Sequence, residues 1–257
     1  MKIDLQDVTF LLPIRLDSIA RLENLIASVE YIYRYFDTNI MITEAASYNN
    51  GLIQKTLKNR IDYTFTNDND PVFYKTKYLN SMTKRVTTPL LAIWDVDVVV
   101  DKRQIIDAVT QLRDQNADIA YPYDGTFIDT TDIFKKLFFL KKNVRILHKY
   151  KDKMNSLYGK EHIGGAIFVN AEKYKSAGGE SERFYGWGPE DFDRHERWIK
   201  MEYVIYRAPG PMYHLSHPRD MNGQFRSRSQ MNSTGNELKK TKSSTKEEII
   251  KNNTWYD

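Results

Sequence analysis

The stretch Leu90-Leu91-Ala92-Ile93-Trp94-Asp95-Val96-Asp97 joins an apolar run to two carboxylates. Five consecutive apolar residues are typical of a buried strand, so the acids lie at its carboxyl end. Residues two apart in an extended segment point the same way, so Asp95 and Asp97 can face one site while Val96 packs behind. Their oxygens suit Mg²⁺ or Mn²⁺, which often bridge a protein to substrate phosphates. Two acids that merely open a loop are the alternative explanation.

Segments with the periodicity of strands and helices alternate along the chain. Strands are expected over residues 8–12 (ended by Pro13), 39–43, 61–65, 90–94, 118–121, 163–170 and 203–206. Helices are expected over residues 17–36, 51–60, 74–85, 101–115, 132–145, 171–177 and 189–201. The alternation predicts an α/β fold with a mostly parallel central sheet flanked by helices. Ligands bind such sheets beyond the carboxyl ends of the strands, where residues 95–97 lie.

The composition is that of a globular chain: 257 residues, 41% hydrophobic and 28% charged, enough for one large domain. There is no run of eighteen apolar residues and no signal-peptide pattern, so we expect no membrane span. The absence of cysteine excludes disulfides and thiolate metal sites and fits a cytoplasmic protein. A net charge of +4 is too small to indicate nucleic acid binding. Residues 226–257 have few large apolar side chains, which predicts a mobile or lightly packed polar extension.

Basic residues are concentrated between positions 135 and 160, where nine lysines and arginines face a single acid, Asp152. A solvated helix face is the commoner explanation of such a run. The alternative is a surface that meets an anionic acceptor or a membrane, which predicts a peripheral membrane contact.

The motif His214-Leu215-Ser216-His217 is a second candidate for metal binding. Residues three apart share a face in a helical turn but not in a strand, and the nearby prolines favour a turn. Two imidazoles on one face can complete a metal shell with Asp97. For either histidine the alternative is an ordinary hydrogen-bonded side chain. The isolated histidines are expected to be structural: His148, His162 and His195.

The motif Trp187-Gly188-Pro189-Glu190-Asp191 is typical of a helix start, with proline first and acids in the first turn. Acids there stabilise the helix, which by itself explains them. The functional alternative is an ionised Asp191 that accepts a proton from a hydroxyl, with Trp187 stacked on a sugar ring.

A further segment, Phe73-Tyr74-Lys75-Thr76-Lys77-Tyr78-Leu79-Asn80, is expected to be helical. Its spacing places Lys77 and Asn80 on one face, where either can meet a phosphate or a ribose. Taken alone, the segment is explained by an ordinary amphipathic helix.

In their order along the chain, the motifs resemble those of GT-A-fold glycosyltransferases, most closely the β-1,4-galactosyltransferase group with its bacterial relatives. The resemblance spans residues 8–220. It rests on Phe10-Leu11-Leu12-Pro13-Ile14-Arg15, on the segment from Phe73 to Asn80, on Trp94-Asp95-Val96-Asp97, on Gly164-Gly165-Ala166, on Phe184-Tyr185-Gly186-Trp187-Gly188-Pro189-Glu190-Asp191 and on His217-Pro218-Arg219-Asp220. It implies one GT-A (Rossmann-like) domain over residues 1–225, with a nucleotide-sugar half over 1–123 and an acceptor half over 124–225.

The resemblance also implies roles for individual residues. The donor site would comprise Pro13, Arg15, Phe73, Lys75, Lys77, Asp95, Val96 and Trp187. The acceptor site would comprise Trp187, Glu190 and Asp191, with Asp191 as catalytic base and Glu190 beside it. The ligands of Mn²⁺ or Mg²⁺ would be Asp97, His217 and His214. The chain departs from the family pattern at four positions: Lys75 for Arg, His214 for a Met ligand, Pro189 for Gly and Phe192 for an acid.

The implied enzyme is inverting and moves a hexose or an N-acetylhexosamine from a UDP-sugar to a glycan or a lipid-linked saccharide. Galactose or GalNAc is the expected sugar, and cytoplasmic synthesis of a surface polysaccharide is the expected setting. Residues 209–225 are expected to close over the donor as a lid. The alternatives are a sugar nucleotidyltransferase and a catalytically inactive binding module. The former should have a Gly-rich phosphate loop after the first strand, where this chain has Pro13-Ile14-Arg15-Leu16-Asp17-Ser18.

Overall fold

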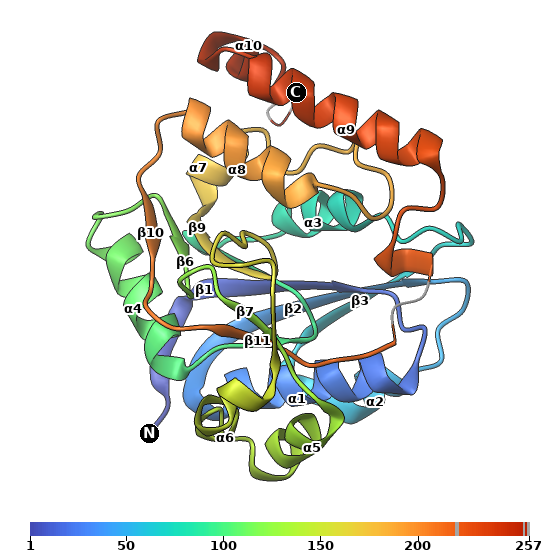
Figure 1. Cartoon of the computed structure of the whole chain (residues 1–257), viewed down its shortest axis with the longest axis vertical. Helices are drawn as coiled ribbons and strands as arrows, with labels where there is room; N and C mark the ends of the chain where they lie inside the picture. Colours follow the sequence, from blue (N-terminus) through green and yellow to red (C-terminus); the bar gives the residue numbers. More distant parts are fainter. Residues whose placement is uncertain (219–220, 254, 256–257) are drawn as a thin grey trace.

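The computed structural model describes residues 1–218, 221–253 and 255. Within these residues the chain forms a seven-stranded sheet of order β10-β6-β9-β4-β1-β2-β3 and a four-stranded sheet of order β5-β11-β7-β8. Helices flank both faces of the large sheet, with α1 and α2 on one side and α3, α8 and α9 on the other (Figure 1). The predicted α/β architecture is confirmed.

The large sheet is parallel except for one strand. Its members are β1 (Ile3–Ile14), β2 (Phe36–Ala46), β3 (Asp62–Asn67), β4 (Leu90–Trp94), β6 (Ile119–Tyr121), β9 (Ala166–Asn170) and β10 (Ile205–Arg207). Strand β9 runs antiparallel to both of its neighbours, β4 and β6. The beginning of β9 therefore lies beside the carboxyl end of β4, the edge at which ligands bind in such sheets.

The small sheet was not predicted, because periodicity cannot be recognised over two or three residues. Its strands are β5 (Val98–Val99), β7 (Phe127–Asp129), β8 (Asn155–Leu157) and β11 (Met212–His214). Strand β11 lies between β5 and β7, antiparallel to the first and parallel to the second. The pairing sets His214 opposite Val98, next to the acidic motif at the end of β4.

Polar caps define where several helices begin. The Ser18 hydroxyl accepts from the N–H of Arg21 at the start of α1, and Asp101 and Gln104 form a capping box at α4. The helix expected over residues 132–145 is two helices, because Lys142 takes a left-handed conformation with φ of 49°. The helices are α1 (Ile19–Tyr35), α2 (Leu52–Leu57), α3 (Lys75–Thr83), α4 (Lys102–Arg113), α5 (Asp132–Lys141), α6 (Arg145–Lys149), α7 (Ala171–Ser176), α8 (Glu190–Lys200), α9 (Arg228–Ser243) and α10 (Lys246–Lys251), with short 3₁₀ turns at Lys58–Arg60, Lys151–Lys153 and Met221–Gly223.

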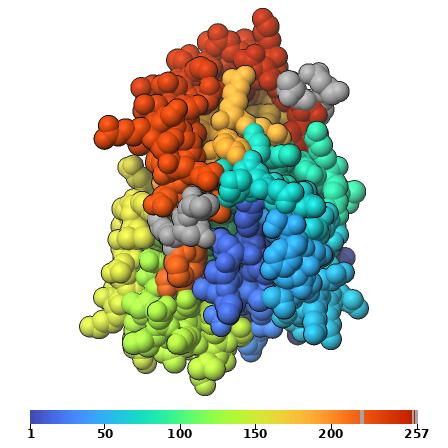
Figure 2. Space-filling model, turned by 90° about the vertical axis from the view of Figure 1, so that its right-hand side faces the viewer, coloured from blue at the N-terminus to red at the C-terminus, as the bar shows by residue number. Residues whose placement is uncertain are grey.

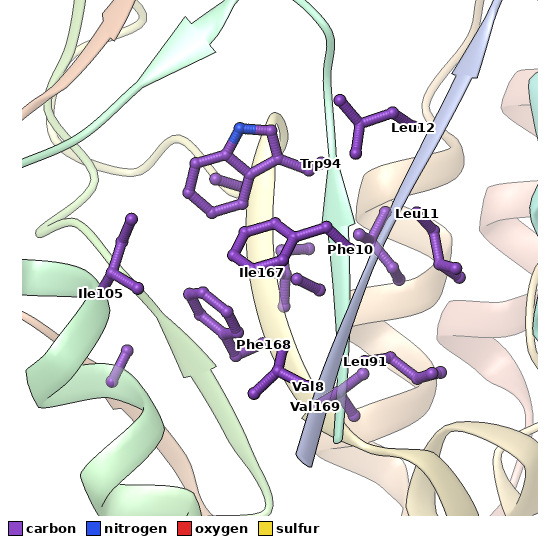
Figure 3. Close-up of a cluster of buried hydrophobic side chains, with 14 of the residues drawn as sticks. Val8, Phe10, Leu11, Leu12, Leu91, Trp94, Ile105, Ile167, Phe168 and Val169 are labelled. Atoms are coloured by element: carbon purple, nitrogen blue, oxygen red, sulfur yellow. The ribbon is translucent and has the colours of Figure 1, made fainter. Parts of the chain in front are cut away.

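Three aromatic side chains from adjacent strands meet in the core (Figure 3). The Phe10 ring centroid lies 5.2 Å from that of Trp94 and 5.6 Å from that of Phe168, in edge-to-face geometry. All three are fully buried, and Trp94 Nε1 also donates to the carbonyl of Val98 at 3.3 Å. Close packing of this kind leaves little freedom, so the residue before Asp95 is held firmly in place.

Strand β1 is longer than predicted. Pro13 does not end it, and the chain continues to Ile14 with Pro13 opposite Thr43 of β2. Strand β4 pairs with β1 only as far as Leu11, so the last residues of β1 have one neighbouring strand. A proline is tolerated at such an edge, because fewer ladder hydrogen bonds depend on its missing N–H.

Residues 226–257 contain two helices that the composition did not predict. The Ser227 side chain caps α9, and Thr245 and Glu248 form a capping box at α10. Helix α9 packs along α8 and buries Thr234, and Ile249 of α10 is buried as well. The mobility expected of this extension stays a prediction. None of the helices in the described ranges has the length and apolar character needed to cross a bilayer.

Candidate active site

Asp97, His214 and His217 form a cluster beyond the carboxyl end of β4. One ligand atom of each lies within 4.8 Å of the others. The His217 Nε2 atom is 3.0 Å from one Asp97 carboxylate oxygen, and the His214 Nε2 atom is 3.8 Å from the other. The structure therefore brings together the three residues that the sequence suggested as metal ligands.

The histidines reach Asp97 by strand pairing, so the expected helical turn is wrong. His214 ends β11 opposite Val98. The N–H of Leu215 then donates to the carbonyl of Asp97 at 2.7 Å, which ties the following segment to the acidic motif. His217 reaches the same carboxylate from this segment.

Each imidazole is held through its other ring nitrogen. The Nδ1 atom of His214 lies 2.6 Å from an Asp129 carboxylate oxygen, and Nδ1 of His217 lies 2.8 Å from the carbonyl of Pro218. A proton on Nδ1 satisfies these acceptors and leaves Nε2 of the neutral ring free to be a ligand. Such support is typical of metal-binding histidines. The donor set of two nitrogens and a carboxylate therefore fits a divalent cation.

Asp97 is kept ionised by its neighbours. Burial disfavours its charge, but His214, His217 and Arg21 outweigh this and lower its pKa below the ordinary value. The nearest Arg21 nitrogen is 3.9 Å from the carboxylate. An ionised carboxylate needs to lose no proton before it binds a cation.

Asp95 faces a lysine rather than the histidines. Lys75 Nζ lies 2.7 Å from Asp95 Oδ1. Burial raises the pKa of Asp95, and the charges of Asp97 and Asp191 add to this effect, while Lys75 opposes it. Burial disfavours the Lys75 ammonium, but Asp95, Asp191 and Glu190 together raise its pKa. Lys75 is therefore a permanent cation among acids.

Asp191 lies in the first turn of α8 and accepts a hydrogen bond from Arg194. Arg194 is fully buried, and its second nitrogen donates to the buried carboxylate of Glu180 at 2.6 Å. Burial disfavours charge on Asp191, but Arg194 and Lys75 outweigh this and lower its pKa. Asp191 is thus an ionised, partly exposed carboxylate that can accept a proton.

The pKa of Glu190 is shifted in the opposite direction to that of Asp191. Burial and the neighbouring charge of Asp191 raise the pKa of Glu190 to about 8. Its buried Oε2 atom has no hydrogen-bond partner among the described residues. Two adjacent carboxyl groups therefore differ in protonation near neutral pH, with Asp191 charged and Glu190 neutral.

Gly164 and Gly165 join the acidic motif to α8. The N–H of Asp95 donates to the carbonyl of Gly165 at 2.7 Å, and the Tyr123 hydroxyl donates to the carbonyl of Gly164 at 2.6 Å. A Cβ atom at Gly164 would collide with a carboxylate oxygen of Asp191. Glycine at this position lets the first turn of α8 approach the end of β4.

Arg15, predicted in the donor site, spans the loop after β3. It donates to the carbonyls of Ala45 and Asp70 at 3.0 and 2.6 Å and forms a salt bridge of 2.9 Å with Asp68. Its guanidinium lies 5.7 Å from the Phe73 ring centroid. Arg15 therefore orders the loop that leads to Phe73.

The other donor-site candidates lie apart from this loop. Pro13 and Val96 are buried. Lys77 follows Lys75 by about 200° around α3, so it is exposed on the side of the helix away from Asp95. Lys77 and Asn80 are three residues apart on α3, as predicted, but Asn80 is buried and donates to the carbonyl of Glu180 at 2.9 Å, so it does not face solvent beside Lys77.

Trp187 offers an exposed aromatic surface. Its side chain is 42% exposed and contacts Phe225 edge to face, with ring centroids 4.7 Å apart. Gln230 of α9 donates to the carbonyls of Tyr185 and Trp187 at 2.9 and 3.0 Å. Helix α9 therefore fixes the loop on which Trp187 is presented.

Several residues of the site were not found from the sequence. Asp129 ends a strand that is too short to recognise from periodicity. Arg194 could have been found, because residues three apart on a helix are neighbours and Arg194 follows Asp191 by three. His162, expected to be structural, lies close enough to help lower the pKa of Asp191. Arg219 and Asp220, part of the resemblance and of the predicted lid, lie outside the described residues.

Two comparisons with known proteins bear on the fold. Residues 131–218 match a family model described as the N-terminal domain of galactosyltransferase. The catalytic domain of Drosophila β1,4-galactosyltransferase 7, solved in complex with xylobiose, superposes with a TM-score of 0.52 at 15% identity, over 93% of this chain and 81% of that chain. The chain has a galactosyltransferase fold. Curated protein sequences give no significant match. The two matches support a glycosyltransferase and confirm the GT-A expectation for the fold.

Glu190→Gln should stabilise the protein increasingly as the pH rises. The folded pKa of Glu190, about 8, lies above its ordinary value of 4.5, so the native state loses stability as pH rises between these values. Glutamine has no proton to lose, so its advantage should grow by roughly 1 kcal/mol or more from about pH 5 to about pH 9. Urea unfolding of both proteins across this range measures it, and an advantage that does not change with pH would contradict the assignment.

Proposed function

We propose that this protein is an inverting, cation-dependent glycosyltransferase that moves a hexose or an N-acetylhexosamine, in the first place galactose or GalNAc, from a UDP-sugar to a hydroxyl of a glycan. One observation carries the proposal: the cluster of Asp97, His214 and His217 and the carboxylate of Asp191 converge on the same edge of the sheet. The likeness of the fold and of residues 131–218 to galactosyltransferases supports the same class.

The residues of the candidate site have different roles in such a reaction. Asp97, His214 and His217 would hold the cation, which when bound supplies positive charge to the donor diphosphate. Asp191 accepts the proton of the acceptor hydroxyl while that oxygen forms its bond to the anomeric carbon. The bond from this carbon to the diphosphate oxygen breaks in the same step and UDP departs with the electron pair. Attack from the opposite face inverts the anomeric configuration.

The surrounding side chains assist through charge and position. Lys75 adds a permanent cation beside Asp95, close to where the diphosphate would lie. Glu190, neutral near pH 7, can donate a hydrogen bond to the acceptor without competing for its proton. The exposed face of Trp187 suits a sugar ring.

The acceptor is proposed to be a glycan or a lipid-linked saccharide in the synthesis of a surface polysaccharide on the cytoplasmic side of a membrane. Acceptors of this class are hydroxyl-rich, which suits the polar and aromatic groups around Asp191. A catalytically inactive binding module is the alternative, and turnover with an acceptor would distinguish the two.

Asp97→Ala should abolish cation-dependent binding of UDP. The change removes the one anionic ligand of the cluster, so we expect affinity to fall at least about 100-fold. Calorimetric titration of UDP and of a panel of UDP-sugars with Mn²⁺, with Mg²⁺ and with a chelator measures this. His148→Gln, at a histidine that contacts Tyr213 outside the cluster, is the control and should bind as the unchanged protein does. Binding that a chelator leaves intact would refute the metal site.

Asp191→Asn should spare donor binding and remove transfer. The amide cannot take up the proton of the acceptor, so we expect turnover to fall by about 10²–10⁴-fold. The matched control is Glu196→Gln, which neutralises a partly exposed acid elsewhere on α8. Full activity of Asp191→Asn in a transfer assay would show that another group is the base.

Arg194→Met should shift the pH dependence of transfer. Without the guanidinium, burial raises the pKa of Asp191. When the pH is lowered, the variant should therefore lose activity at a higher pH than the unchanged protein does. The single change also leaves Glu180 buried without its cation, so Arg194→Met should be compared with the double variant Arg194→Met, Glu180→Gln. Arg194→Lys should restore much of the profile, and an unshifted profile in the double variant would contradict this role.

A further inference from the structure

Helix α5 carries apolar side chains on its outer face as well as on its inner face. Ile133 and Leu140 are 70% and 77% exposed. They are seven residues apart, about two turns, and so lie on the same side of the helix. Phe138, on the opposite side, is fully buried in the smaller hydrophobic cluster. The outer face is therefore not needed to attach α5 to the protein.

Exposed lysines accompany these two side chains on α5 and on the segment after it. They are Lys136 and Lys141 on α5, Lys149 at the end of α6, and Lys151 and Lys153 in the 3₁₀ turn that follows. The turn is close to α5, because the rings of Phe134 and Tyr150 stack 5.0 Å apart. Two exposed acids accompany them, Asp132 and Asp152, and the first lies 3.4 Å from Lys135. The surface therefore combines an excess of positive charge with two exposed aliphatic side chains.

We propose that this surface, Ile133, Lys136, Leu140 and Lys141 of α5 with Lys149, Lys151 and Lys153, binds an anionic lipid bilayer. The aliphatic side chains would enter the headgroup region, and the lysines would pair with lipid phosphates. Charge alone would also suit a soluble anion, but such a ligand leaves Ile133 and Leu140 in water, where their exposure is unfavourable. A bilayer is an anionic partner that buries both kinds of side chain.

The surface is joined to the candidate active site. Lys135 Nζ, on the inner side of α5, donates to the carbonyl of Ser216 at 2.5 Å, between the two histidines of the cluster. Figure 2 shows α5 (light green) at the lower end of the face that also carries the segment around residue 217 (orange). A bilayer contact would thus set the height of the site above the lipid. The membrane contact itself goes beyond the transfer reaction and does not depend on it.

Vesicle flotation of the full chain, without donor or acceptor, tests the proposal. Vesicles of phosphatidylcholine alone are compared with vesicles that also contain phosphatidylglycerol, at low and high salt. We expect binding to the anionic vesicles only, weakened by salt. The double variants Ile133→Ser, Leu140→Ser and Lys136→Glu, Lys141→Glu should each bind at least about fivefold more weakly.

Matched variants on other surfaces serve as controls. Val204→Ser, Ile250→Ser removes two aliphatic side chains that are 56% and 52% exposed, and Lys239→Glu, Lys251→Glu reverses two exposed lysines of α9 and α10. Both should bind vesicles as the unchanged chain does. No preference for anionic vesicles, or equal binding by the α5 variants and the controls, would overturn the proposal. UDP titration of the same variants separates this outcome from failure of the proposed transfer reaction.

Discussion

The candidate site depends on holding four carboxyl groups of two distant segments close together. Repulsion between them would open the site unless each charge is compensated. Lys75 compensates Asp95, Arg194 compensates Asp191, and the two histidines lie against Asp97. Burial, together with the charge of Asp191 next to it, raises the pKa of Glu190. Burial and the distribution of cations together thus decide which carboxyl group carries a proton, and with it which chemistry each can perform.

The antiparallel strand of the large sheet makes this proximity possible. Because β9 runs against β4, its first residues lie beside the last residues of β4, and α8 can reach the same edge. The small sheet forms the other side of the candidate site, because the pairing of β11 with β5 places His214 directly opposite Val98. A purely parallel sheet would place the start of the strand next to β4 at the far end, away from the acidic motif.

The sequence allowed the long elements and the acidic motifs to be predicted, because these rest on local periodicity. Strand β4 occupies the predicted residues 90–94, and α1 and α4 agree within a few residues at each end. The two histidines were linked to Asp97 correctly but for the wrong reason, since a three-residue strand has no periodicity to detect. The Glu180 partner of Arg194 could not be predicted either, because it lies before α8 and only the folded loop brings it there. Polar contacts between α9 and α8 cannot be predicted from the spacing of apolar residues either.

The hydrogen bonds from Gln230 to the loop of Trp187 have a consequence for divergence. A Cβ atom at Gly186 would approach Gln230 within 2.9 Å, and the Thr234 side chain lies just beyond Gly188. Substitutions in α9 and in residues 185–188 therefore constrain one another, although α9 lies outside the matched galactosyltransferase region. Related chains that carry a different helix in place of α9 should carry a different loop with it. The loop of Trp187 and α9 would then be inherited as a paired unit, independent of the cluster around Asp97.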